Sequence, residues 1–370
     1  MSRGENRITV RGDRPRIALI RLGAMGDCIY TFPLVSALKA RYPKADITWI
    51  VEAQHQEIPW LHPGVDDVIA VDTKRWRREL FSGWPGRMVG EFGAIRRSLK
   101  AKEFDIALDP QGLIKSGVIA WLTSAPVRIG LARVASREGM NTLFTTHRVD
   151  SPDGHIVRKN LSLLTPLEIV VGSPDFGIRV SHEAEARVAS LLKEAGLGPG
   201  DRLVGIHPGV GYSRKRWNLD RYAQVGDRLH ERGGARVILT AGPGEEALAG
   251  YVASKMRSAP VVVPPLQVGE FAALLSRYDL LIAGDTGPLH LAAALGCQTV
   301  AIYGPSDPVR VAPVGEGHRI LKKACACGWT PDLHFNRRCP DVPCLKSITV
   351  EEVTVAARGL LECPSAARTC

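Results

Sequence analysis

The chain alternates between short apolar runs and longer segments with apolar residues at helical spacing, separated by turns rich in glycine and proline. Short apolar runs of this kind are typical of strands buried in a parallel sheet. Their alternation with helical segments predicts βαβ units. Strands are predicted at residues 16–21, 46–51, 68–71, 104–108, 203–207, 237–240, 261–263, 280–283 and 299–303. Helices are predicted at residues 29–42, 221–232, 271–278 and 350–362, and also after residues 113 and 287.

The segment 279–308 carries the strongest local signal. Its first strand enters the turn GDTGP (284–288), where we expect Asp285 or Thr286 to cap the following helix. A glycine turn at a helix N-terminus presents unpaired N–H groups and the positive end of a helix dipole, which together favour phosphate. An ordinary capped turn would share that pattern. His290 on the first helical turn, and a second Gly-Pro turn one strand later, favour the phosphate site.

The strand pattern pauses near residues 170–182. We therefore predict two doubly wound domains, residues 1–175 and 176–370. Open α/β sheets bind ligands at the carboxyl ends of their strands. Two such domains facing each other predict a cleft for a small molecule between them.

Composition is that of a globular protein, with 45% apolar and 23% charged residues in 370. No apolar run is long enough to span a bilayer, and residues 1–15 lack the apolar core of a signal peptide, so a cytoplasmic location is expected. The net charge of +10 indicates an acidic partner: nucleic acid, an anionic membrane surface or a phosphorylated substrate. Charge alone does not choose among these.

Four cysteines cluster late in the chain, at Cys325, Cys327, Cys339 and Cys344. In a cytosolic protein such a cluster indicates a metal site or free thiols rather than disulfides. The spacing matches no standard zinc pattern closely. A structural zinc is one of the two alternatives.

Five motifs follow one another along the chain: RLGAMGDCIYTFP (21–33), LDPQGLIKSG (108–117), IHPGVGYSRKRW (206–217), AGPGEE (241–246) and GDTGPLHLAAALG (284–296). In this order they resemble the lipopolysaccharide heptosyltransferases, the ADP-heptose-dependent inverting enzymes of glycosyltransferase family 9. The resemblance implies a GT-B architecture of two Rossmann-like domains facing a central cleft. The N-terminal domain would bind the acceptor, and the C-terminal domain, with the Cys cluster and a final helix, would bind the nucleotide sugar.

Two further stretches, KRWRREL (74–80) and ASREGMNTLF (135–144), look most like the heptosyltransferase I subgroup, which adds the first heptose to a Kdo sugar of the inner core. The resemblance implies the partners: a nucleotide-sugar donor and an acceptor of the Kdo-lipid A type. It also implies an enzyme peripheral to the inner membrane, held by its positive charge at the anionic surface, with no nucleic-acid partner.

The resemblance places the general base at Asp27, which would take the proton of the acceptor hydroxyl. The alternative is that Asp27 only caps its helix. The chain has no Asp-x-Asp pair to hold a divalent metal. We therefore expect no required cofactor, and expect the helix start at Thr286 and Gly287, together with Lys215, to stabilise the leaving diphosphate. On sequence alone Lys215 would be a solvated loop lysine.

The remaining candidate residues fall into two groups. Donor contacts are expected from Ser213, Glu245, Glu246, Asp285, Thr286, Gly287 and His290. The acceptor is an anion that lysine and arginine bind well, although a basic run is usually a solvated face. Acceptor contacts are expected from Lys74, Arg75, Arg77, Arg78, Lys115 and Arg137.

Three other functions remain open. The first is heptosyltransferase II, or a relative that uses another nucleotide sugar or acceptor. The second is a Rossmann oxidoreductase, for which Gly23, Gly26 and Glu52 form only a degenerate fingerprint. The third is a basic nucleic-acid-binding protein with a zinc module, which leaves the GDTGP turn unexplained.

Overall fold

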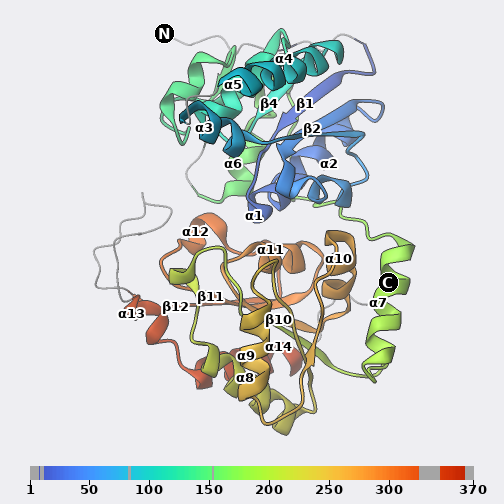
Figure 1. Cartoon of the computed structure of the whole chain (residues 1–370), viewed down its shortest axis with the longest axis vertical. Coiled ribbons are helices and arrows are strands. Elements are labelled where there is room, and N and C mark those ends of the chain that lie inside the picture. Colours follow the sequence, from blue (N-terminus) through green and yellow to red (C-terminus); the bar gives the residue numbers. More distant parts are fainter. Residues whose placement is uncertain (1–7, 9–11, 82–84, 152–153, 325–341, 363–370) are drawn as a thin grey trace. The chain divides into compact units, whose positions relative to one another are not determined.

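The computed structural model describes residues 8, 12–81, 85–151, 154–324 and 342–362. The chain divides into two compact units, Met1–Arg179 and Val180–Cys370. The sequence pattern placed the boundary four residues earlier, between residues 175 and 176. Each unit contains one parallel sheet of six strands with helices packed against it (Figure 1).

The sheet of the first unit has the strand order β3-β2-β1-β4-β5-β6, and every neighbouring pair is parallel. Its strands are β1 Arg16–Ile20, β2 Asp46–Glu52, β3 Asp67–Val71, β4 Ile106–Asp109, β5 Val127–Leu131 and β6 His147–Val149. Its helices are α1 Met25–Ile29, α2 Phe32–Arg41, α3 Thr73–Phe81, α4 Pro85–Ala101, α5 Ile114–Leu122 and α6 Ile156–Ser162. Short 3-10 turns are η1 Ala53–His55, η2 Ile58–Leu61, η3 Gly139–Leu143 and η4 Thr165–Leu167.

The second unit repeats this topology, with the order β12-β11-β10-β7-β8-β9 and all pairs parallel. Its strands are β7 Leu203–His207, β8 Arg236–Leu239, β9 Val261–Val262, β10 Leu280–Gly284, β11 Gln298–Tyr303 and β12 His318–Lys322. Its helices are α7 His182–Glu194, α8 Leu219–Gly233, α9 Glu246–Lys255, α10 Val268–Arg277, α11 Gly287–Ala294, α12 Pro308–Val311, α13 Pro343–Lys346 and α14 Val350–Glu362, with the 3-10 turn η5 at Ser213–Lys215.

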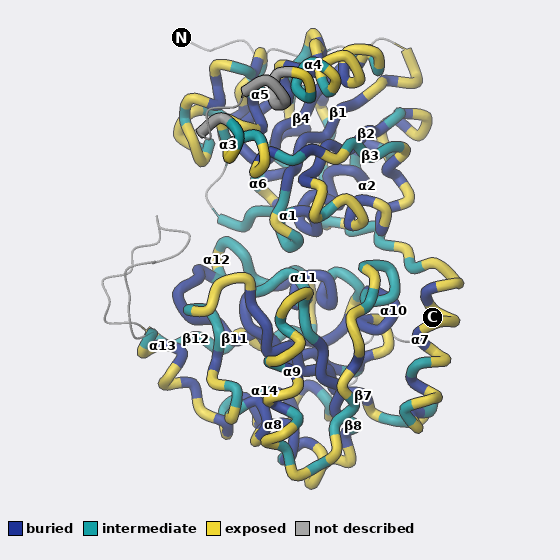
Figure 2. Tube along the Cα trace, in the orientation of Figure 1, coloured by how far each residue is buried: buried dark blue, intermediate teal, exposed yellow. Residues whose placement is uncertain are grey.

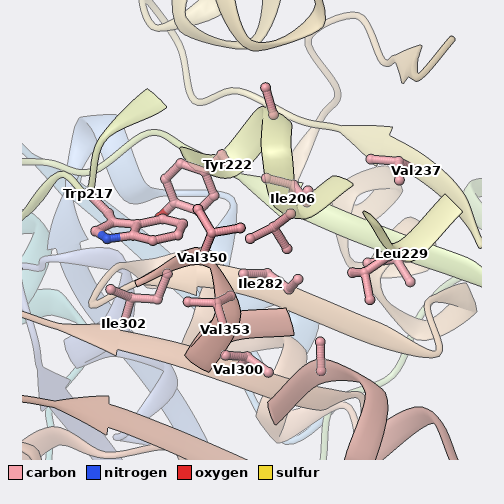
Figure 3. Packing of buried hydrophobic residues seen from close by; sticks show 14 of the residues in the cluster. Ile206, Trp217, Tyr222, Leu229, Val237, Ile282, Val300, Ile302, Val350 and Val353 are labelled. Atoms are coloured by element: carbon pink, nitrogen blue, oxygen red, sulfur yellow. The ribbon is translucent and has the colours of Figure 1, made fainter. Parts of the chain in front are cut away.

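The inner strands of each sheet are buried, as their colour in Figure 2 shows; among them are β1, β2, β4, β7, β10 and β11. In the first unit, alternate residues of β1, β2 and β4 pack against α4 and α5 through a cluster that includes Ile20, Ile50, Leu99 and Ile119. In the second unit, β7, β8, β10 and β11 pack against α8, α9 and α14 (Figure 3). Burial of these apolar faces is the main force that stabilises the two sheets.

The predicted doubly wound α/β fold is therefore confirmed in both units, and the predicted strands all form. The predicted helix at 29–42 forms as α2, which begins three residues later than predicted, with Pro33 in its first turn. The short helix α1, which ends at Ile29, was not predicted as a separate element. Proline suits a first helical turn, where its missing N–H is not needed.

No helix in the described residues is long and apolar enough to cross a membrane.

Candidate active site

In the first unit, the order of the strands reverses between β1 and β4, and the loops after these two strands meet there. Open α/β sheets bind ligands at this switch point. The guanidinium of Arg21, only 2% exposed, joins the two loops: its Nη1 donates to the Pro110 carbonyl at 2.9 Å. The Leu22 N–H donates to the Gln111 side-chain oxygen at 2.8 Å. These bonds fix the position of the loop that leads to Asp27.

The Asp27 carboxylate is held by the same arginine. Its Oδ1 lies 3.0 Å from Nη2 of Arg21, while the side chain stays 27% exposed. The alternative that Asp27 caps its helix is wrong, because the N-cap of α1 is Ala24 and no side chain caps it. A buried cation therefore orients a carboxylate that solvent can reach.

Gly23 shows why the loop needs glycine. Its φ is +144°, and a Cβ there would lie 2.6 Å from Cδ2 of the His55 ring. Only glycine combines that backbone conformation with so close an approach.

Asp109, at the end of β4, is fully buried under the second loop. Its carboxylate accepts hydrogen bonds from the backbone N–H groups of Gln111 and Gly112, at 3.0 and 3.2 Å. It also accepts bonds from Ser116 at 2.9 Å and Asn141 at 2.7 Å. Burial raises the pKa of this carboxyl above its usual value although the four bonds oppose the shift. Asp109 shapes the loop rather than meeting a substrate.

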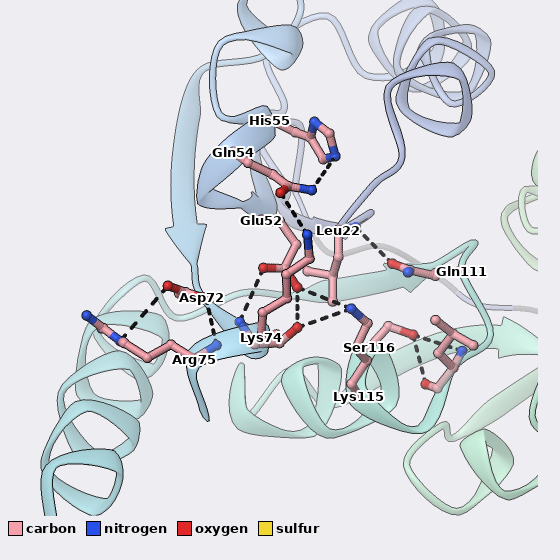
Figure 4. Close-up of polar contacts among 12 residues, drawn as sticks. Leu22, Glu52, Gln54, His55, Asp72, Lys74, Arg75, Gln111, Lys115 and Ser116 are labelled. Carbon is pink, nitrogen blue, oxygen red and sulfur yellow. Dashed lines mark hydrogen bonds and ion pairs between the residues drawn. The ribbon is translucent and has the colours of Figure 1, made fainter. Parts of the chain in front are cut away.

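Two of the predicted acceptor residues are oriented from the end of β2 (Figure 4). The ammonium of Lys115 lies 3.1 Å from Oε1 of Glu52, and that of Lys74 donates to the Gln54 side-chain oxygen at 2.8 Å. Glu52 and Gln54 thus place two cations near the carboxyl end of β2.

The structure does not bring the other predicted acceptor residues together with Lys74 and Lys115 through a shared partner. Arg75 on α3 is paired with Glu91 of α4 at 2.5 Å. Arg78 on α3 and Arg137 in the loop after β5 are exposed. The side chain of Arg77 lies outside the described residues.

The second unit has its switch point between β7 and β10, and the GDTGP turn follows β10 there. The buried Asp285 carboxylate lies 2.5 Å from the Lys215 ammonium and 3.2 Å from Nε2 of His290. Burial acts to raise the pKa of Asp285. The hydrogen bond from His290 and the positive charge of Lys215 outweigh burial, so that pKa lies far below its ordinary value. Two predicted donor residues, Asp285 and His290, therefore form one charged cluster with Lys215, the residue expected to stabilise the leaving diphosphate.

Thr286 occupies the N-cap position of α11, as one of the two expectations had it, but its side chain makes no capping bond. Asp285 does not cap the helix, since its carboxylate bonds to Lys215 and His290. Pro288 has no N–H. At the start of α11, the backbone N–H of Gly287 is therefore the group that can donate to a ligand.

Two of the predicted donor residues, Glu245 and Glu246, differ in their surroundings. Glu245 turns toward the loop after β7, where it accepts the Val210 N–H at 3.1 Å and lies 3.7 Å from Arg216. Glu246 is exposed and accepts the Gly244 N–H at 3.1 Å. Ser213 is an exposed residue of η5.

Sequence reasoning missed two residues that support these loops. Arg21 was taken only as the end of a strand, although a charged residue after a buried apolar run is a usable signal. His207 at the end of β7 is buried, with its Nδ1 2.9 Å from the Thr240 hydroxyl. Burial lowers the pKa of His207 to about 4.

The zinc expectation gains no support. Cys325, Cys327 and Cys339 lie outside the described residues, and Cys344 is buried in α13. Among the described residues, no group of three or more His, Cys, Asp or Glu side chains could hold a metal ion.

Comparison with known proteins places the chain in a family. Residues 92–336 match the model of "Glycosyltransferase family 9 (heptosyltransferase)". The chain belongs to glycosyltransferase family 9. It is 29% identical over 357 residues to lipopolysaccharide heptosyltransferase 1 of Pseudomonas aeruginosa, covering 94% of this chain and 91% of that relative. It is 26% identical over 308 residues to the Escherichia coli K12 protein of the same name, covering 83% and 93%.

Solved structures agree with the fold of this family 9 enzyme. A family 9 glycosyl transferase from Veillonella parvula superposes with a TM-score of 0.82 at 26% identity, covering 96% of this chain and 99% of that one. E. coli heptosyltransferase WaaC with ADP gives a TM-score of 0.76 at 22% identity, covering 93% and 99%. The predicted GT-B fold, with one Rossmann-like domain in each unit, is confirmed. Membership of family 9 replaces the oxidoreductase interpretation, and Glu52 is engaged by Lys115 and Thr73.

Proposed function

We propose that this family 9 enzyme transfers heptose from ADP-heptose to the Kdo inner core of lipopolysaccharide, with inversion at the anomeric carbon. The relatives named lipopolysaccharide heptosyltransferase 1 support the reaction. The E. coli WaaC structure with ADP-2-deoxy-2-fluoro heptose supports the donor class. The observation that carries the mechanism is the Asp27 carboxylate, aimed by buried Arg21 yet reachable from solvent.

In the proposed step, the acceptor hydroxyl attacks the anomeric carbon from the face opposite the nucleotide. A new C–O bond forms while the bond from that carbon to the β-phosphate oxygen breaks. The hydroxyl proton passes to the Asp27 carboxylate, and ADP leaves with the electron pair. A base held within reach of the hydroxyl contributes typically about 10²–10⁴-fold to the rate.

The donor group comprises the charged cluster of Asp285, Lys215 and His290, and the turn around it. Lys215 and the N–H of Gly287 stabilise charge that develops on the leaving diphosphate, so the reaction requires no metal. The low pKa of Asp285 keeps it ionised and able to orient Lys215. Thr286, Ser213, Glu245 and Glu246 complete this donor group.

The acceptor group is on the first unit. Its basic residues match the carboxylates of Kdo and the phosphates of lipid A. The group comprises Lys74, Arg75, Arg77, Arg78, Lys115 and Arg137. The net charge of +10 favours a cytoplasmic enzyme peripheral to the anionic inner membrane.

The proposal is tested by ADP release from ADP-heptose in EDTA, with Kdo-lipid A or its heptosylated form as acceptor. Release that depends on Kdo-lipid A and survives EDTA supports it. Release only with the heptosylated acceptor assigns the chain to the heptosyltransferase II reaction instead. Release abolished by EDTA and restored by a divalent cation contradicts the metal-independent mechanism.

A further inference from the structure

Glu52, the last residue of β2, has a carboxylate that the proposed reaction does not use. Its side chain is 6% exposed. One oxygen accepts the backbone N–H of Thr73 at 3.2 Å, and the other accepts the Thr73 hydroxyl and lies 3.1 Å from the Lys115 ammonium. Burying a charge is costly unless it is paired and hydrogen-bonded, and here these contacts compensate it. One buried carboxylate thus holds residues from two helices.

Those two helices carry the basic residues. Thr73 is the first residue of α3, which also contains Lys74, and Lys115 lies in the first turn of α5. Figure 4 shows both helix starts converging on Glu52. The carboxylate therefore fixes the start of α3 and the ammonium of Lys115 at the same point.

The geometry leaves Lys115 oriented and accessible at once. Its ammonium lies 3.1 Å from Glu52 and 3.1 Å from the Thr73 hydroxyl, and its side chain is 42% exposed against 6% for Glu52. An ammonium has three N–H donors, so two face the protein and one can meet an anion. A lysine held in this way loses less side-chain entropy when it binds than a solvated one does.

We infer that Glu52 is a positioning residue that presents Lys115 to an anionic group of the acceptor, with Thr73 as the second partner. The inference rests on the proposed function, because it takes the acceptor to be an anion bound by the first unit. An ion pair made by a buried carboxylate is weak evidence of a role in stability, since the desolvation cost of that carboxylate offsets much of the attraction. Orientation of the exposed cation explains the pair better. The Glu52 carboxylate thus binds Lys115 and Thr73, whereas the oxidoreductase interpretation would have it bind the ribose of a dinucleotide.

The test is steady-state kinetics with varied Kdo-lipid A and saturating ADP-heptose. Glu52→Gln keeps an oxygen for the Thr73 N–H but removes the charge. We expect Glu52→Gln and Lys115→Ala each to raise the acceptor KM about tenfold, the effect of losing one charged contact, with the donor KM unchanged. The double variant should be no worse than Lys115→Ala alone, because both remove the same contact. Lys193→Ala, an exposed lysine at the end of α7, is the matched control.

Thr73→Val is the second variant if Glu52→Gln folds poorly, and it should raise the acceptor KM less than Lys115→Ala does. Suppose that Lys115→Ala raises the acceptor KM, whereas folded Glu52→Gln or Thr73→Val leaves it unchanged. That result overturns the positioning role of Glu52 but keeps Lys115 in the acceptor group. Independent, multiplying effects in the double variant also overturn it. An unchanged acceptor KM in Lys115→Ala removes Lys115 from the proposed acceptor group, and the inference with it. If the wild type shows no ADP release that depends on Kdo-lipid A, the proposed function itself is contradicted.

Discussion

The Arg21 guanidinium lies 3.0 Å from the Asp27 carboxylate and is almost completely buried, while the carboxylate is partly exposed. The same guanidinium is bound to the loop after β4 through the Pro110 carbonyl. The position of Asp27 therefore depends on both loops at the switch point of the first sheet. A catalytic base needs such a fixed direction as well as a charge.

Arg21→Lys should lower kcat about 10²-fold, the cost of a misplacement near 1 Å. Lysine keeps the positive charge but cannot reach Asp27 and Pro110 together, because it lacks the planar fork of arginine. Measured kcat, with circular dichroism to confirm folding, tests this. A folded Arg21→Lys enzyme with normal kcat would show that charge alone is enough.

Lys215→Ala should lower kcat about 10²-fold, as expected for losing one group that stabilises a developing negative charge. Binding of ADP, measured by calorimetry, should weaken as well. Arg232→Ala, an exposed cation at the end of α8, is the control and should change neither quantity. If ADP binding and turnover were unaffected in Lys215→Ala, Lys215 would be only the partner of Asp285.

The sequence predicts the sheets well because a strand covered on both faces must be apolar throughout, as 203–207 and 280–283 are. It does not predict the half-exposed strands β6 and β12, whose residues include His147, His318 and Lys322. It also does not predict α1 as a separate helix, because Gly23 and Gly26 are typical of a turn.

Motifs locate the candidate residues but not their partners. Asp27 and Asp285 both follow glycine-rich turns and could both cap a helix by pattern alone. Arg21 and Asp27 flank one and the same glycine loop, so their ion pair depends on how that loop folds back. Lys215 and Asp285 pair because the fold brings together two loops that are 70 residues apart. Such tertiary contacts leave no local signal.

Gly23→Ala should destabilise the first unit by about 1–3 kcal/mol, the usual cost of a backbone conformation that other residues avoid. The new Cβ would also meet the His55 ring at 2.6 Å and displace the loop that precedes Asp27. Gly93→Ala in α4 is the matched control. A Cβ there meets nothing within 4 Å, and alanine in a helix should stabilise the protein by about 0.5–1 kcal/mol. Urea unfolding should show opposite signs for the two variants.

His207 predicts how stability depends on pH. Burial lowers its pKa from 6.5 to about 4, so the folded protein keeps the ring neutral while the unfolded chain binds a proton. The contribution of the buried neutral ring to the free energy of unfolding is complete above pH 6.5 and is lost as the pH falls toward 4. His207→Gln should flatten the fall in urea midpoint over that range. His182 is exposed, so His182→Gln should leave the pH dependence of the urea midpoint unchanged. An equal pH dependence of the midpoint in wild type and His207→Gln would show that His207 does not cause it.

The most direct test of the account is the turnover of Asp27→Asn with ADP-heptose and Kdo-lipid A. The amide preserves the size of the side chain but cannot accept the proton. The account predicts a loss of about 10²–10⁴-fold in kcat with ADP-heptose binding unchanged. Turnover close to that of the wild type would contradict it and would place the general base elsewhere.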